Sequence, residues 1–176
     1  HFTNACSQWW VAPHGGAEGR FVTNPFTVGI PMPDSEPIVL DFATSAIAQG
    51  KVRVAYNKGV DVPPNSLIDS SGAPTNDPAV LFEPVDGKLG ALVTTGAHKG
   101  YALAVVCELL GAALTGGETT RPATRPVHAV GNNMLAIVFD PKKLGTESVF
   151  GNEAAAFIEW VKSARKQPGV EEILMP

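Results

Sequence analysis

The longest apolar stretch of the chain runs from Tyr101 to Leu114 and contains one charged residue, Glu108. A helix that is apolar on every face is typical of a protein interior. The pattern therefore predicts a central helix over 101–114 that is buried on all sides. The stretch is too short for a membrane span, and Glu108 interrupts it.

Two further stretches have helical patterns with recognisable ends. The stretch 46–59 follows Thr44 and Ser45, either of which can cap a helix, and Gly59 closes it. The stretch 152–166 begins with an asparagine cap, continues with an acidic residue and ends in basic residues, which is the charge placement that a helix dipole favours. The sequence predicts a helix over each.

Short apolar or alternating runs between these helices predict strands. They lie at 1–4, 21–31, 38–45, 90–95, 132–140 and 170–175. Pro25 disfavours a central position of its run in a parallel sheet. The connections 60–78 and 116–131 are longer than the short turns of a doubly wound fold. We therefore expect an α+β fold with a mixed, largely antiparallel sheet and helices packed on it.

The composition changes this picture little. Of 176 residues, 44% are hydrophobic and 17% charged, which suits one globular domain. The net charge of -4 and the lack of a basic run argue against a nucleic-acid partner, and no segment suits a membrane partner. Cys6 and Cys107 belong to no CxxC pair, so no disulfide or thiol-redox site is expected. Cys107 is predicted to be a core thiol, which fits a reducing compartment.

Several polar residues at element ends are candidates for binding. Lys99 precedes the apolar helix, where the helix dipole repels a cation unless an anion docks beside it; a side chain that extends into solvent is the alternative. The neighbouring His98 is either a neutral donor to a ligand or a surface residue. Asp41 ends a strand, so it either accepts hydrogen bonds from sugar hydroxyls or caps the next helix. Asn24 and Pro25 form either an inward-pointing bulge or an ordinary turn.

The common catalytic and nucleotide motifs are absent. No GxGxxG follows a strand, and no GxxxxGK[ST] occurs, so neither a Rossmann fold nor a P-loop is expected. The glycines of "HGGAEG" precede a strand, and a flexible turn explains them. The four histidines lack the spacing of metal ligands, so we expect no metal site.

Four stretches, taken in order, resemble the type 2 malate/L-lactate dehydrogenase family, which includes ureidoglycolate dehydrogenase and diketogulonate reductase. They are "VAPHGGAEGRFVTNPFTVGIP", "IVLDFATSAIAQGKV", "GAPTNDP" and "GALVTTGAHKGYALAVVCELLGAALTGG", followed by "NNMLAIVFD". The resemblance implies an oxidoreductase that uses NAD or NADP to interconvert small 2-hydroxy acids and 2-oxo acids. It further implies a non-Rossmann cofactor domain and a cytoplasmic enzyme that is a homodimer at full length.

The resemblance also implies which residues bind the cofactor. They are Leu40, Asp41, Phe42 and Ala43 from "LDFA", and His98 and Lys99 from "HKG". A serine that contacts the cofactor commonly follows "TN" in the family, and here that position is Ala5, with Ser7 nearby. Asn24 and Pro25 are expected on the substrate side.

The family's catalytic histidine lies upstream of the strand that "HFTN" matches, and a cofactor loop follows the last strand. We therefore expect 1–176 to be a single cofactor-binding domain, a fragment of a longer chain. It would hold no catalytic residue and would have no turnover by itself. A binding or interaction module that retained the fold and lost the chemistry is the alternative. An upstream "NxxH" stretch would favour the enzyme.

Overall fold

The computed structural model describes residues 1–176 except 7, 33–34 and 122–130. The chain divides into two compact units. The first comprises His1–Phe26 and Asp41–Ala136, and the second comprises Thr27–Leu40 and Ile137–Pro176. That the whole chain is one cofactor-binding domain stays a prediction.

The larger sheet is built on antiparallel pairs. Strand β1 (Phe2–Cys6) pairs along its length with β7 (Gly131–Leu135), and it also pairs with β2 (Phe26–Ile30) where Phe2 meets Phe26. The strand order is β3-β2-β1-β7, with β3 at Ile38–Phe42. The α+β expectation with a largely antiparallel sheet is confirmed. The strand β2 begins directly after Pro25, which has no N–H to donate to a ladder.

A second, smaller sheet has two of its three strands in the connection 60–78, which the sequence suggested was irregular, and its third strand within the predicted strand over 90–95. Its order is β5-β4-β6, from β4 (Leu67–Ile68), β5 (Pro74–Thr75) and β6 (Ala91–Leu92), and all of its pairs are antiparallel. The 3-10 helix η1 (Pro78–Leu81) follows β5. The expectation of an irregular 60–78 was therefore wrong, because strands of two residues are too short to leave a pattern.

Helix α1 (Gln49–Lys58) packs on this smaller sheet through the main core of the first unit. That core contains Val11, Val52, Ala55, Val62, Leu67, Leu81 and Leu92. The predicted helix is confirmed, and Gly59 ends it with a φ of 64°, a conformation that glycine adopts at little cost. The predicted cap is wrong, because Ala48 occupies the N-cap and no side chain caps the helix.

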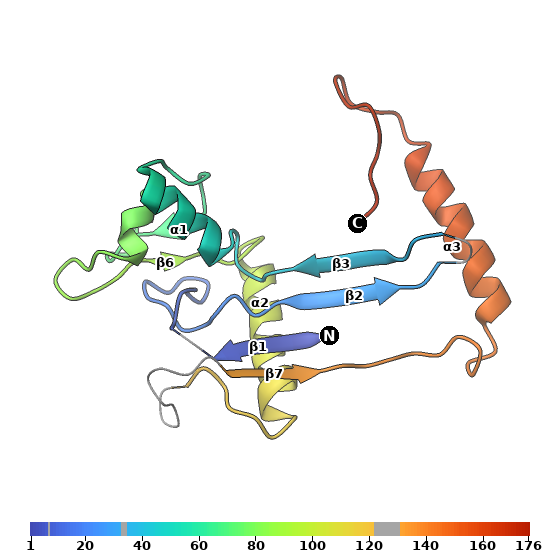
Figure 1. The fold of residues 1–176 in the computed structure, drawn as a ribbon, viewed down its shortest axis with the longest axis horizontal. Coiled ribbons are helices and arrows are strands. Elements are labelled where there is room, and N and C mark those ends of the chain that lie inside the picture. Colours follow the sequence, from blue (N-terminus) through green and yellow to red (C-terminus); the bar gives the residue numbers. More distant parts are fainter. Residues whose placement is uncertain (7, 33–34, 122–130) are drawn as a thin grey trace. The chain divides into compact units, whose positions relative to one another are not determined.

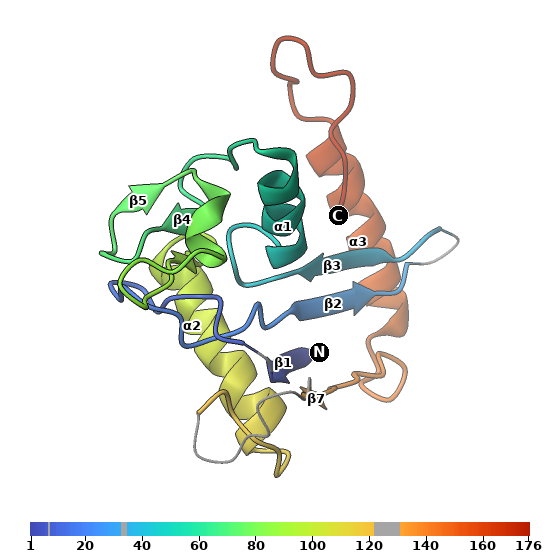
Figure 2. The same cartoon turned by 60° about the vertical axis from the view of Figure 1, so that its left-hand side comes forward.

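The apolar helix begins earlier than predicted and is buried on one face only. Helix α2 (His98–Val106) continues directly into the π-helix η2 (Cys107–Ala113), which packs against β1 (Figures 1 and 2). Its small residues Gly100, Ala104, Gly111 and Ala112 face the interior. Leu109 and Leu114 are 54% and 67% exposed. The expectation of burial on all sides was therefore wrong. Mainly small residues of this helix face the interior, whereas the large apolar side chains of Leu109 and Leu114 lie on its exposed face.

The second unit contains α3 (Glu147–Lys162), which confirms a helix in the region of the predicted 152–166. It begins with Glu147 in its first turn and ends with Lys162, and Thr146 is its N-cap in place of the expected asparagine. In the part of the chain that the structure describes, the predicted strand over 170–175 is absent, and this segment is irregular. Among the described residues, no helix has the length and apolar character needed to cross a bilayer.

Candidate functional site

A short backbone ladder joins two segments that are far apart in the sequence. The Thr95 amide donates to the carbonyl of Thr44 at 2.9 Å, and the Ala46 amide donates to the carbonyl of Val93 at 2.9 Å. Between them, Ser45 and Thr94 form an antiparallel bridge. The residues that follow "LDFA" are therefore backbone neighbours of the residues that precede "HKG".

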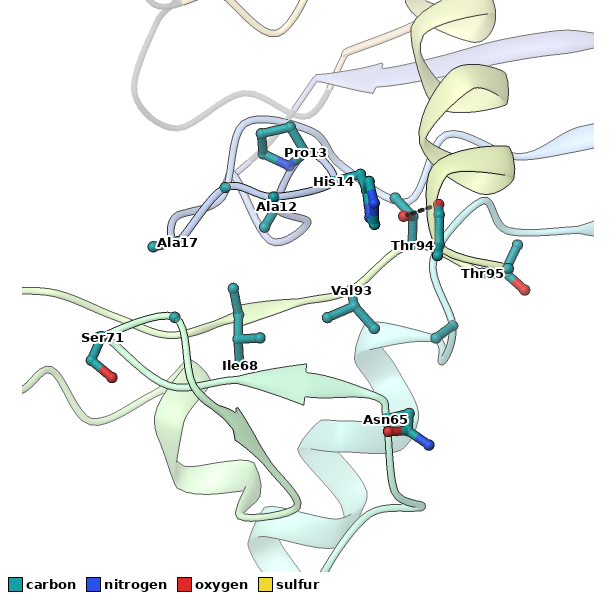
Figure 3. Close-up of a pocket in the computed structure, with 16 residues that line it drawn as sticks. Ala12, Pro13, His14, Ala17, Asn65, Ile68, Ser71, Val93, Thr94 and Thr95 are labelled. Atoms are coloured by element: carbon teal, nitrogen blue, oxygen red, sulfur yellow. Dashed lines mark hydrogen bonds between the residues drawn. The ribbon is translucent and has the colours of Figure 1, made fainter.

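One cavity opens beside this ladder, and we call it the glycine-rich cavity (Figure 3). It has a volume of about 600 Å³, which lies within the usual range for small-molecule sites. Four parts of the chain line it, namely 12–17, Ala46, 93–97 and the region from Asn65 to Gly72. Four of its lining residues are glycines, so backbone as well as side chains is open to a ligand.

The loop that carries "HGGAEG" forms one wall of this cavity. His14 lies on that wall near Thr94 (Figure 3), and its ring lies 6.1 Å from the ring of His98 in an edge-on arrangement. The sequence analysis interpreted this loop as a flexible turn and did not predict that it lines a cavity. The two adjacent glycines beside His14 were the feature of the sequence that could have indicated a binding loop. Among the described residues, no three His, Cys, Asp or Glu side chains are arranged to hold a metal ion.

Residues of the ladder also line a second cavity, which we call the α1 cavity. It has a volume of about 450 Å³ and shares Ala46 and Thr95 with the glycine-rich cavity. Its full lining is Phe42, Ala43, Ser45, Ala46, Ile47, Ala48, Lys51, Pro63, Ser66 and Thr95. The two cavities are therefore adjacent, and one extended molecule can contact both.

The structure gives each predicted cofactor residue a definite place. Phe42 and Ala43 line the α1 cavity, and Asp41 and Leu40 are exposed in β3. His98 and Lys99 are the first two residues of α2 and are exposed, beside Gly96 and Ala97 of the glycine-rich cavity. Neither Asp41 nor Lys99 lines either of these cavities. That these two residues share one cleft stays a prediction.

Asn24 and Pro25 do not line these two cavities either. The side chain of Asn24 is fully buried and donates hydrogen bonds to Glu108 Oε1 at 2.8 Å and to the Ala104 carbonyl at 3.3 Å. The Pro25 carbonyl accepts from the Thr3 amide at 3.1 Å. Both are therefore bonded within the protein, and a substrate-side role stays a prediction. Ala5 lies in β1, and Ser7 lies outside the described residues.

A buried carboxylate organises the interior beside α2. Glu108 lies in η2, is 5% exposed and accepts three hydrogen bonds. The donors are the side-chain amides of Asn24 at 2.8 Å and Asn4 at 3.3 Å, and the backbone amide of Thr120 at 2.9 Å. Sequence reasoning noted Glu108 only as an interruption of an apolar helix.

Cys107 precedes this carboxylate and confirms the predicted core thiol. It is free and fully buried. Burial raises the pKa of the Cys107 thiol, and the neighbouring Glu108 charge acts in the same direction. The thiol therefore stays protonated and unreactive at neutral pH.

The N-cap of α2 is a strained residue at the mouth of the glycine-rich cavity. Ala97 has φ 55° and ψ −119°, a conformation that a residue with a Cβ rarely adopts. Thr94 holds it by donating from Oγ1 to the Ala97 carbonyl at 2.7 Å. Strain of this kind costs about 1–3 kcal/mol and tends to occur at functional sites.

We expect Ala97→Gly to raise the free energy of unfolding by about 1 kcal/mol, since relief of strain outweighs the added freedom of the unfolded chain. Urea unfolding measures it. The matched control is Ala102→Gly, at an exposed position inside the same helix, which should lower stability by about 1 kcal/mol. Equal losses in both variants would contradict the assignment of strain to Ala97.

Comparisons with known proteins agree on one family. The family model described as malate/L-lactate dehydrogenase matches residues 1–176. Hydroxycarboxylate dehydrogenase B of Escherichia coli (strain K12) is 48% identical over 166 residues, covering 93% of this chain and 45% of the relative. L-lactate dehydrogenase of Cupriavidus necator is 40% identical over 168 residues, covering 94% and 47%. The chain therefore spans less than half the length of these curated relatives.

A solved structure shows the same likeness in three dimensions. The delta1-piperideine-2-carboxylate reductase of Pseudomonas syringae pvar. tomato is 35% identical. It superposes with a TM-score of 0.73 and covers 96% of this chain and 51% of that one. The match in fold therefore extends over nearly the whole chain.

Proposed function

Because the chain belongs to the malate/L-lactate dehydrogenase family, we propose that it is the cofactor-binding part of an NAD- or NADP-dependent oxidoreductase. The relatives named above are dehydrogenases or reductases of hydroxycarboxylate, lactate and cyclic imino-acid substrates. The proposed reaction therefore interconverts a small 2-hydroxy acid and the corresponding 2-oxo acid.

The ladder from Thr44 to Thr95 is the observation that carries this proposal. It joins the residues that directly follow "LDFA" to the residues that precede "HKG" through main-chain hydrogen bonds. The family resemblance assigns both motifs to the cofactor. A cofactor site divided between distant segments needs such a junction, and the two adjacent cavities extend from it.

The polar groups around the cavities suit a dinucleotide. His14, Asn65, Thr94 and Thr95 offer hydrogen-bond donors and acceptors to amides and sugar hydroxyls. Lys99 and His98, at the start of α2, lie where a phosphate gains from both the side-chain charge and the helix dipole. Phe42 adds an aromatic surface to the α1 cavity. The donor set therefore fits a cofactor with planar, sugar and phosphate parts.

Each residue has a proposed task in the reaction. When bound, the nicotinamide group supplies or accepts the hydride. Lys99 neutralises phosphate charge, and His98 donates a hydrogen bond beside it. Asp41 accepts hydrogen bonds from ribose hydroxyls. The family resemblance assigns proton exchange with the substrate hydroxyl to a histidine in a part of the subunit that these motifs do not include.

A binding or interaction module without catalysis is the competing function. The full-length protein with this function would bind neither reduced nor oxidised nicotinamide dinucleotide, and it would not oxidise NADH or NADPH with any 2-oxo acid. We propose the enzyme, and we also propose that the full-length protein is a cytoplasmic homodimer. Sedimentation analysis of the full-length protein tests the dimer.

We expect Lys99→Ala in the full-length protein to weaken cofactor binding about ten- to a hundredfold, because a charge-assisted phosphate contact is lost. The melting temperature without cofactor should change little, since Lys99 is exposed. Calorimetric titration with NADH and NADPH measures the affinity. Lys58→Ala, at the far end of α1, is the control and should bind as the unchanged protein does. Unchanged affinity in Lys99→Ala would contradict the role of Lys99.

A further inference from the structure

The α1 cavity has one charged residue in its lining. Lys51 lies in the first turn of α1, and its side chain lines this cavity. Phe42 and Ala43, which the family resemblance places at the cofactor, line the same cavity. No carboxylate lines it, and the remaining side chains there are apolar or are uncharged serine and threonine hydroxyls. Lys51 therefore supplies the charge in the lining of this cavity.

The charge of Lys51 is not used within the described part of the protein. The ion pairs found among the described residues, Arg20 with Glu18 and Lys162 with Glu172, leave it out. The first turn of α1 holds no acidic residue, so the helix provides Lys51 with no neighbouring counter-charge. A lysine in that turn faces the positive end of the helix dipole, which is unfavourable. An anion in the cavity would offset this cost.

The other cations of α1 are occupied or distant. The Arg53 guanidinium lies 3.5 Å from the ring centroid of Phe82 and 5.8 Å from that of Tyr56, so it stacks on aromatic rings away from the cavity. Lys58 is in the last turn, where the dipole favours a cation. Lys51 is therefore the cation of α1 that is free to bind a ligand in the cavity.

We propose that Lys51 binds a phosphate group of the dinucleotide cofactor in the α1 cavity. This inference rests on the proposed function. A dinucleotide offers two sources of phosphate, namely the pyrophosphate and, in NADP, the 2′-phosphate on the adenosine ribose. The cavity shares Ala46 and Thr95 with the glycine-rich cavity, beside which Lys99 lies, so Lys51 and Lys99 serve separate parts of one extended molecule.

Equilibrium binding of NADPH and NADH to the full-length protein tests this assignment. The variants are Lys51→Ala and Lys51→Gln, with Lys58→Ala as the matched control on the same helix. Both positions are exposed, so thermal melting without cofactor should be nearly unchanged. Fluorescence titration of the reduced cofactors gives the affinities without any turnover.

We expect a loss of affinity of about ten- to a hundredfold in both Lys51 variants and none in Lys58→Ala. A loss for NADPH alone assigns Lys51 to the 2′-phosphate, and an equal loss for NADPH and NADH assigns it to the pyrophosphate. Unchanged affinity for both cofactors in the Lys51 variants would overturn the inference and leave the proposed function intact. If the unchanged protein bound neither cofactor, both would be overturned.

Discussion

Replacing Gly100 with alanine should lower the free energy of unfolding by about 3 kcal/mol, because the first turn of α2 has no room for a Cβ. An added Cβ would lie 3.0 Å from the Thr44 carbonyl oxygen and 2.9 Å from the Thr95 nitrogen, and closer still to the Thr95 oxygen. All three atoms are backbone of the ladder, which cannot shift without breaking its hydrogen bonds. The substitution would also separate the two cofactor motifs.

Gly50→Ala is the matched control for this prediction. Gly50 lies inside the first turn of α1, and nothing lies within 4 Å of a Cβ built there. Alanine should therefore raise stability by about 0.5–1 kcal/mol through better helix propensity. Urea unfolding of both variants gives the comparison. A Gly100→Ala protein as stable as the unchanged one would show that α2 does not approach Thr44 this closely.

Glu108→Ala should cost more than about 3 kcal/mol of folding free energy. The substitution leaves the amides of Asn4, Asn24 and Thr120 without their acceptor in the interior, and each buried unsatisfied donor costs about 1–3 kcal/mol. Water that enters the space would recover part of this loss. Chemical unfolding followed by circular dichroism measures it.

An exposed glutamate serves as the control for Glu108. Glu153→Ala, on the exposed surface of α3, should change stability by less than about 0.5 kcal/mol. Glu108→Gln keeps the side-chain volume but places an amide donor opposite protein donors. Its loss of folding free energy should therefore lie between those of Glu108→Ala and Glu153→Ala. A Glu108→Ala protein that matched Glu153→Ala would mean that the three amides find other partners.

Local signals in the sequence predicted much of the fold. Gly59 ended α1 as expected, because glycine acts through its own backbone geometry. The strand predicted over 21–31 is shorter than expected, because β2 begins only after Pro25. The charges of α3 likewise predicted a helix. Residues 60–78 were misread because β4 and β5 have two residues each, too few to show the alternation of apolar and polar positions that identifies a strand.

The interior around η2 could not be predicted from the sequence for a different reason, because its contacts join segments that are far apart in the chain. The partners of Glu108 are Asn4, Asn24 and Thr120, which lie on three separate segments, so nothing near Glu108 in the chain reveals them. The strain at Ala97 was also hidden, since an alanine gives no sign that its φ is positive. The resemblance supplied the cofactor motifs, but the contribution of the "HGGAEG" wall was visible only once the chain was folded.

The bridge between Ser45 and Thr94 has a consequence for the kinetics of folding. It closes a loop of roughly fifty residues, and closure of such a loop must occur before either cavity exists. The loop contains α1 and the smaller sheet, whose contacts are mostly local and can form first. The two cavities are therefore late products of folding, and a partly folded chain would contain its helices before it could form the proposed cofactor site.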